Sequence, residues 1–161
     1  MIIHRFIAES DAHYLRAVDP FSMDQIYEYS LRMMQSGDAS SDISLPVFWD
    51  FRWVNLLHCK VEELRRHIGR RDRLGKAYRN NPTAIVVGDQ GSFGMMRMYG
   101  ILADLEGLRD ESRTLVTLDF RAAIDWLVAT TEKPYPEDDR FREALRIACA
   151  ATTFQTASLT S

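Results

Sequence analysis

The sequence predicts an α/β fold with a mostly parallel, five-stranded sheet. Two observations lead to this prediction. Short, nearly unbroken apolar runs, such as 45–51 and 83–88, are typical of strands buried on both faces. Segments with helical spacing of apolar residues separate these runs. Because strand and helix alternate along the chain, we expect parallel neighbours joined by right-handed crossovers.

The chain begins with a predicted antiparallel hairpin. Residues 2–8 and 12–18 are apolar-rich runs, and the three polar residues 9–11 between them are of the kind that turns a chain. Asp19 and Pro20 then end the second strand. The hairpin therefore supplies two of the five predicted strands.

Two helices are predicted in the first half of the chain. Ser22 followed three residues later by Gln25 is the pattern of a capping box, and the helix it opens should run to about Ser36. The strand 45–51 follows and carries Asp50 near its carboxyl end. From 59 to 78 the spacing is again helical, although two glycines disfavour one straight helix.

The second half repeats this alternation. The strand 83–88 leads into a helix predicted from Phe93 to about Leu105, and the run 113–118 predicts the fifth strand. Asp119 is placed to cap a last core helix. These elements make up one predicted domain, 1–130.

The segment 131–161 is predicted to lie outside this domain. It opens with a Pro-rich, acidic linker, continues with an amphipathic helix over 137–151, and ends in a frayed Thr/Ser-rich tail.

Composition and charge exclude several classes of protein. The chain has 161 residues, 46% of them hydrophobic, which is the composition of one ordinary globular domain. No apolar stretch approaches the roughly 20 residues of a membrane span, and the first residues do not form a signal peptide. The two cysteines form no disulfide or zinc pattern. We therefore expect a cytoplasmic protein without a cofactor, and the net charge of -3 argues against general binding of nucleic acid.

Three segments resemble SpoIIAA-like proteins of the STAS superfamily, whose fold is similar to that of CRAL-TRIO domains. The strand 84–88 leads into Ser-Phe-Gly-Met-Met-Arg-Met-Tyr at 92–99. Residues 116–127 look like the last strand and closing helix of that family, and Trp-Asp-Phe-Arg at 49–52 is similar to its third strand. The resemblance spans roughly 2–129. It implies neighbouring strands in sequence order, with the helices largely on one face.

The resemblance also implies a function. Its best-understood members bind partner proteins and are switched by phosphorylation of a serine at the start of the helix after the third strand. Here that region, 54–60, contains no hydroxyl side chain. We therefore predict a non-enzymatic binding or regulatory module, with a protein partner and without the phosphorylatable serine.

Five residues are candidates for binding a ligand or partner, most of them near the carboxyl ends of the predicted strands, where ligands of open α/β sheets bind. They are Asp50, Arg52, Asp89, Ser92 and Arg97. Asp50 and Asp89 would end neighbouring strands, and such a pair can act as general acid and base, whereas the structural alternative is a carboxylate that caps a helix. We favour capping.

Ser92 has three interpretations. The segment 90–94 is close to a nucleophile elbow, but Gln90 stands where that motif needs glycine. The loop can also hold an anion at a helix start, although Asp89 would oppose a phosphate. Ser92 as a helix cap is the simplest interpretation, and an unrecognised hydrolase is the alternative.

A metal site is weakly indicated and is not predicted. His58 with Glu62, and Cys59 with Glu63, are each four residues apart and can share a helical face. Two ligands do not make a site, so ordinary polar packing is the better explanation.

A basic stripe lies between 60 and 79, where eight basic residues stand against three acidic ones. Its densest members are Arg65, Arg66, Arg70, Arg71 and Arg73. A solvated helix is the simplest interpretation, with an acidic protein partner ahead of nucleic acid as the functional one. In a homodimer, the acidic segments 104–111 and 132–139 could neutralise the stripe instead.

Methionines offer a second functional hypothesis. Met95, Met96 and Met98 are flexible apolar side chains that can line a cavity, although methionine at helical spacing is usually core. The alternative to a partner-binding module is therefore a small carrier of an apolar ligand.

Overall fold

The structure is a computed structural model that describes residues 1–8, 11–37, 41–71, 74 and 80–131, together with 143, 147 and 150. Its five strands form one sheet in the order β1-β2-β3-β4-β5. The strands are β1 (Ile2–Ile7), β2 (Ala12–Ala17), β3 (Val47–Phe51), β4 (Thr83–Val87) and β5 (Thr114–Thr117). β1 and β2 are antiparallel, and the other neighbours are parallel. The predicted fold class is confirmed.

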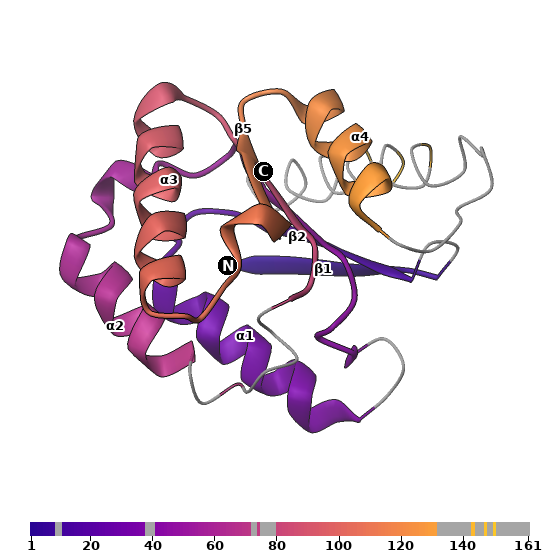
Figure 1. The fold of residues 1–161 in the computed structure, drawn as a ribbon, viewed down its shortest axis with the longest axis horizontal. Coiled ribbons are helices and arrows are strands. Elements are labelled where there is room, and N and C mark those ends of the chain that lie inside the picture. The colour runs from indigo at the N-terminus through magenta and orange to yellow at the C-terminus, as the bar shows by residue number, and fades with distance from the viewer. Residues whose placement is uncertain are drawn as a thin grey trace, which may run out of the picture.

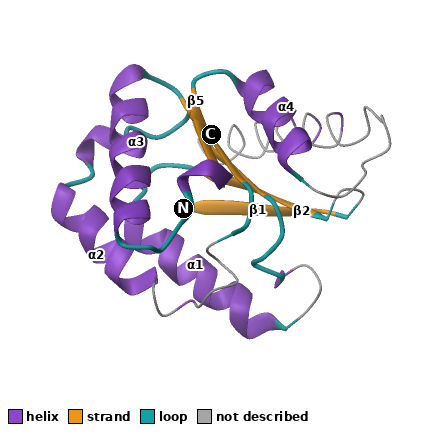
Figure 2. Ribbon diagram, in the orientation of Figure 1, coloured by secondary structure: helices purple, strands orange, loops and turns teal. Residues whose placement is uncertain are grey.

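Four helices connect or follow the strands (Figure 2). They are α1 (Met23–Ser36), α2 (Val61–Arg71), α3 (Gln90–Leu105) and α4 (Phe120–Thr130), with short 3-10 turns η2 (Leu56–His58) and η5 (Glu111–Arg113). Figure 1 shows α1, α2 and α3 on one side of the sheet and α4 on the other. The described helices therefore lie mainly on one face, as predicted.

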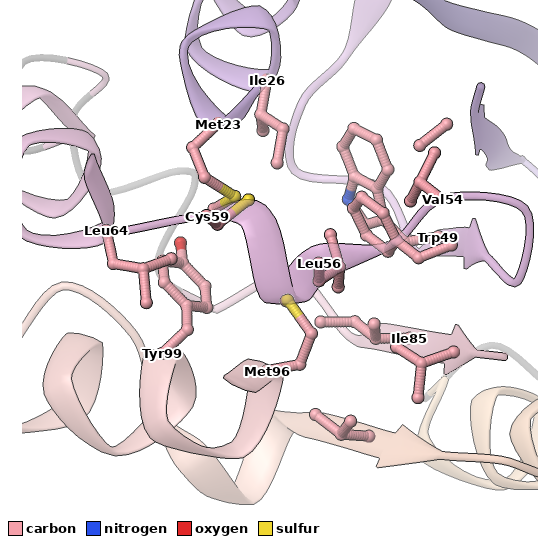
Figure 3. Close-up of a cluster of buried hydrophobic side chains, with 14 of the residues drawn as sticks. Met23, Ile26, Trp49, Val54, Leu56, Cys59, Leu64, Ile85, Met96 and Tyr99 are labelled. Carbon is pink, nitrogen blue, oxygen red and sulfur yellow. The ribbon is translucent and has the colours of Figure 1, made fainter. Parts of the chain in front are cut away.

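Strand alternation divides the core into two layers. On the face of α1, α2 and α3, the sheet contributes Trp49 and Ile85, and Figure 3 shows side chains from η2 and these helices converging on them. On the face of α4, Tyr14 and Phe48 pack with Leu127. Fully burying a side chain of leucine or phenylalanine size contributes roughly 1.5–3 kcal/mol, so both layers stabilise the sheet.

Several predicted boundaries were wrong by a few residues. α3 begins at Gln90 rather than Phe93, because Asp89 is its N-cap. The helix predicted over 59–78 starts later, at Val61, and a separate 3-10 turn, 56–58, precedes it. α2 is described to Arg71, and most of the remaining predicted residues, 72–73 and 75–78, lie outside the described residues. The predicted strand 45–51 begins at Val47.

Of the two predicted N-caps, Asp119 and Ser22, one makes side-chain capping bonds and the other does not. Asp119 caps α4 as predicted, since its side chain accepts from the backbone N–H of Arg121 and of Ala122. Ser22 stands at the N-cap of α1 but makes no side-chain capping bond, so the capping box does not form. The Gln25 side chain instead donates to the Pro20 carbonyl.

The predicted C-terminal segment falls almost entirely outside the described residues. Of the helix predicted over 137–151, only residues 143, 147 and 150 are described, each in helical conformation. Within the described part of the chain, each helix is too short or too polar to span a lipid bilayer.

Candidate functional site

The loops after the parallel strands converge at one edge of the sheet. The register pairs Asp50 of β3 with Val86 of β4, and Val86 with Thr117 of β5. Ligands of open α/β sheets bind where such loops meet. We call this region, formed by residues 52–59, 88–91 and 118–119, the carboxyl edge.

Asp50 is completely buried beside the carboxyl edge and accepts hydrogen bonds from Arg52 and Tyr14. Arg52 Nε donates to Asp50 Oδ1 at 2.9 Å, and Arg52 Nη2 donates to Oδ2 at 2.8 Å. The Tyr14 hydroxyl donates to Oδ2 at 2.8 Å, and the Arg52 backbone N–H donates to Oδ1 at 3.2 Å. Two-point contacts of this kind are among the stronger hydrogen bonds in proteins.

Burial and the arginine act on Asp50 in opposite directions. Removal from water alone would raise the pKa of the carboxyl group, since it disfavours the charged form. Hydrogen bonds and charge from Arg52, with a further bond from Tyr14, outweigh this and hold the pKa below its ordinary value. Asp50 is therefore a permanently charged carboxylate at neutral pH.

Asp89 and Ser92 form a closed pair at the start of α3. Asp89 Oδ1 accepts from the Ser92 backbone N–H at 2.9 Å, and Asp89 Oδ2 accepts from Ser92 Oγ at 2.7 Å. These bonds lower the pKa of Asp89. Capping by Asp89 is confirmed, whereas the prediction that Ser92 is the cap was wrong. Ser92 is buried with its hydroxyl directed to Asp89, and the Asp89 side chain also accepts the Ser92 N–H at the start of α3.

The structure assigns Asp50 and Asp89 to opposite sides of the sheet. Asp50 lies on the face of Tyr14 and α4, because it alternates with Trp49 and Phe51, which pack toward the other helices. Asp89 caps α3 on that other face. The two carboxylates do not form the acid and base pair that strand order alone permits.

Arg52 brings three loops together. Its guanidinium lies over the Phe120 ring, with Cζ 4.5 Å from the ring centroid. Its backbone carbonyl packs against Gly88, where a Cβ would come within 2.6 Å of the oxygen. The loop after β3 is thus fixed against the loop after β4 and against the start of α4.

Arg16 and Trp53 are a second pair at this edge, which sequence reasoning missed. Arg16 is buried in β2 directly opposite Asp50 in the register. Its Cζ lies 4.6 Å from the centroid of the Trp53 ring, a cation–π geometry. Arg16 follows Ala12 and Tyr14 at the spacing of one strand face, and that arginine in an otherwise buried strand was the available signal.

Large apolar side chains are exposed along the carboxyl edge. Trp53 is 51% exposed, Leu57 58% and Leu118 39%. The Leu57 side chain packs against Gly91 at the start of α3, so it contacts the helix as well as its own loop. Trp53 and Leu57 follow β3, and Leu118 follows β5 at the same edge of the sheet. Exposed tryptophan and leucine at one edge are typical of an interaction surface.

The predicted basic stripe is divided among different contacts. Arg66 and Arg70 both pair with Asp24 of α1, at 3.5 and 2.8 Å, and so hold α2 against α1. Arg71 contacts the Tyr99 hydroxyl of α3. Arg65 lines a groove between α2 and α3. Arg73 lies outside the described residues. The stripe is therefore not one uniform binding surface.

Arg97 lies away from the carboxyl edge. It pairs with Glu111 at 3.1 Å, and both side chains are about half exposed. Exposed pairs of this kind contribute about 0–1 kcal/mol. The structure does not bring Arg97 together with Asp50, Arg52, Asp89 and Ser92.

The residues considered as metal ligands do not assemble. His58 is exposed in η2, whereas Cys59 is buried, and burial together with the charge of Glu63 raises the pKa of its thiol. In the described ranges, no three His, Cys, Asp or Glu side chains are grouped so that they could hold a metal ion.

The methionines pack as part of the core. Met96 is buried, and Met95 and Met98 pack against the same core layer. A cavity lined by Met23, Met96 and their neighbours measures about 20 Å³, which is room for about one water molecule and not for an apolar ligand.

His67 is a buried group that the sequence did not reveal. It is completely buried in α2 and lies 5.8 Å from the Tyr99 ring, and neither ring nitrogen makes a geometrically acceptable hydrogen bond within the described structure. Burial and the charges of Arg71 and Arg70 lower its pKa to about 3, although the nearby Met23 carbonyl acts in the opposite direction. His67 is therefore neutral in the folded protein near neutral pH.

Comparison with models of protein families, with curated proteins and with solved structures finds no match to this chain. The resemblance to SpoIIAA-like proteins therefore stays a prediction from the residues quoted above.

Proposed function

We propose that this protein is a non-catalytic binding module that takes a protein partner on its carboxyl edge. The observation that carries the proposal is the exposure of Trp53 and Leu57 on the loop between β3 and α2. Burying side chains of this size against a partner would remove apolar surface from water and so stabilise the complex.

The edge is rigid enough to recognise a partner without rearranging. The Arg16 guanidinium packs against the Trp53 ring, and the Leu57 side chain packs against Gly91. A preorganised surface loses less conformational entropy on binding than a mobile one. Tryptophan in such a position is a frequent energetic centre of protein interfaces.

The polar groups at this edge support a structural rather than a chemical role. Both oxygens of Asp50 are bound by Arg52, and both oxygens of Asp89 are bound by Ser92. A general base needs an accessible lone pair within reach of the substrate proton. The buried Asp50, whose oxygens each accept two hydrogen bonds, offers none without breaking these contacts. Asp89 is exposed and is engaged as the N-cap of α3.

The SpoIIAA-like resemblance points to the same surface, because the switch serine of that family stands at the start of the helix after the third strand, next to this loop. In this chain the loop carries Trp53 and Leu57 and has no hydroxyl side chain between 54 and 60. We therefore expect binding governed by apolar contact, with no phosphorylation switch at this loop.

Site-specific photo-crosslinking tests the proposal. A photoreactive amino acid is placed at position 53 or 57, or as a control at the exposed Glu28 of α1, in cells that naturally make the protein. We expect a discrete cross-linked species from positions 53 and 57 and none from position 28. The Trp53→Ser substitution should abolish the species formed from position 57.

Two results would contradict the proposal. One is the absence of any adduct specific to positions 53 and 57. The other is an enzymatic turnover that Asp89→Asn or Ser92→Ala abolishes while circular dichroism shows an unchanged fold, because that would place chemistry at the edge.

A further inference from the structure

A groove of about 610 Å³ runs between α2 and the end of α3, on the helical face of the molecule and away from the carboxyl edge. Its lining combines apolar side chains with one charge of each sign. The lining residues are Arg65, Ile68, Gly69, Leu102, Glu106 and Leu108. Gly69 leaves its part of the wall open, since an added Cβ would meet no atom within 4 Å.

An apolar ridge adjoins the groove on α3. Leu105 is 76% exposed, the largest exposure among the described large apolar side chains, and Ile101 is 45% exposed. In a helix, residues three and four apart are neighbours, so Leu105 adjoins both Leu102 in the groove and Ile101. The ridge and the groove are thus parts of one continuous surface.

We propose that this surface binds a second copy of the chain, forming a two-fold symmetric dimer in which the Leu105 ridge of each protomer enters the groove of the other. A two-fold interface must be self-complementary, because each contact occurs twice with the partners exchanged. This surface holds both halves of each required pair: a ridge with a groove, and Glu106 with Arg65.

The charges of the groove are available for such an exchange. Arg66 and Arg70, the neighbours of Arg65, already pair with Asp24. Within the described residues, neither Arg65 nor Glu106 takes part in an ion pair of its own. In a two-fold dimer, Arg65 of one protomer meets Glu106 of the other on both sides of the axis. A different protein would need its own groove for the Leu105 ridge and its own charges opposite Arg65 and Glu106.

The expected dimer is weak. An interface to which each protomer contributes one helical ridge and one groove lies at the small end of specific interfaces, which begin near about 1,000 Å² of total buried area. Association should therefore depend on concentration. Sedimentation velocity of the full chain is expected to shift from monomer toward dimer as the protein concentration rises.

A charge-exchange experiment tests the pairing. Arg65→Glu places two acids in the surface, and Glu106→Arg places two bases, so each variant alone should dimerise at least about tenfold more weakly than the wild type. In an equimolar mixture of the two variants, every acid faces a base across the two-fold axis. Native mass spectrometry should then show the heterodimer, recognised by its mass, as the dominant dimer.

A second pair of variants tests the groove without changing charge. Gly69→Leu fills the open wall and should weaken the dimer, while the loss of a helical glycine keeps the fold intact. Gly94→Leu is the matched control, because Gly94 is also an exposed helical glycine with no atom near its Cβ position, and it lies near the other end of α3. It should leave dimerisation unchanged.

A protein that stays monomeric at all concentrations overturns the proposal. So does a dimer that neither Arg65→Glu nor Gly69→Leu weakens, or a mixture of charge variants that does not form the heterodimer. Thermal melts of each variant identify unfolding as a separate cause. Since the surface lies away from the carboxyl edge, cross-linking from position 53 reports on the proposed function independently.

Discussion

The Arg52 guanidinium holds the Asp50 carboxylate with two nearly equal bonds, Nε to Oδ1 at 2.9 Å and Nη2 to Oδ2 at 2.8 Å. The two residues are only two positions apart, so their side chains lie on the same face where β3 ends. Because the same guanidinium covers Phe120, this contact also joins the end of β3 to the start of α4. It connects the sheet, the carboxyl edge and α4, which lies on the same face as Asp50.

Asp50→Asn should destabilise the fold by about 2–4 kcal/mol, because it removes the charged partner of the Arg52 guanidinium in a largely buried ion pair. Arg52 retains partial contact with water, which keeps the loss below that of a fully buried pair. Urea denaturation at neutral pH measures the change.

Tyr14→Phe is the control for Asp50→Asn. It removes the hydroxyl bond to Asp50 Oδ2, leaves the Asp50–Arg52 ion pair in place, and should cost about 1–2 kcal/mol. An Asp50→Asn variant no less stable than Tyr14→Phe would show that the ion pair does not contribute as the geometry indicates.

His67 should make stability fall in mild acid. Its pKa is about 3 in the folded protein against 6.5 ordinarily, so between these values the unfolded chain binds the proton and the folded chain does not. The free energy of unfolding should therefore drop by about 1.4 kcal/mol for each pH unit lost in this window. Denaturant melts at a series of pH values measure the slope.

His67→Leu should remove that slope and leave stability at neutral pH unchanged or higher, because it replaces a buried imidazole whose nitrogens lack good hydrogen bonds. His58→Leu, at an exposed histidine, should retain the slope. The buried His13, whose pKa desolvation also lowers, contributes a smaller pH dependence to every variant. Equal slopes in His67→Leu and the wild type would contradict the assignment.

Gly88→Ala should destabilise the protein by about 1–3 kcal/mol, because its Cβ would lie 2.6 Å from the Arg52 carbonyl oxygen, which is backbone and cannot move aside cheaply. Gly94→Ala, in α3 with open space around it, should instead stabilise by about 0.5–1 kcal/mol. Thermal unfolding of the two variants gives the comparison, and the two melting temperatures should move in opposite directions.

The two N-cap positions should respond unequally to alanine. Asp119→Ala removes two capping bonds of α4 and should cost about 1 kcal/mol. Ser22→Ala removes no side-chain capping bond and should change stability by less than about 0.5 kcal/mol. Equal losses would mean that Ser22 caps α1 in solution after all.

Local patterns were sufficient for the order and type of the elements. The buried run at 83–88 and the capping position of Asp119 depend on burial and on backbone hydrogen bonds within a few residues, which a single sequence records directly. Parallel order followed from alternation, because crossovers constrain neighbouring strands. Element ends were less accurate, as at α3, where the cap is Asp89 and the helix begins three residues before the predicted start.

The composition of the candidate site was decided by tertiary structure. Asp50 and Asp89 are separated because they lie on opposite faces of the sheet. Arg66 and Arg70 form ion pairs with Asp24 because α1 packs against α2. The Trp53 ring packs against Arg16, which lies 37 positions earlier in the chain. The groove at Gly69 forms because α3 lies beside α2. The sequence by itself determined what each segment is, since that depends on neighbours along the chain. Only the folded structure decided which side chains meet, because those contacts join residues that are distant in sequence.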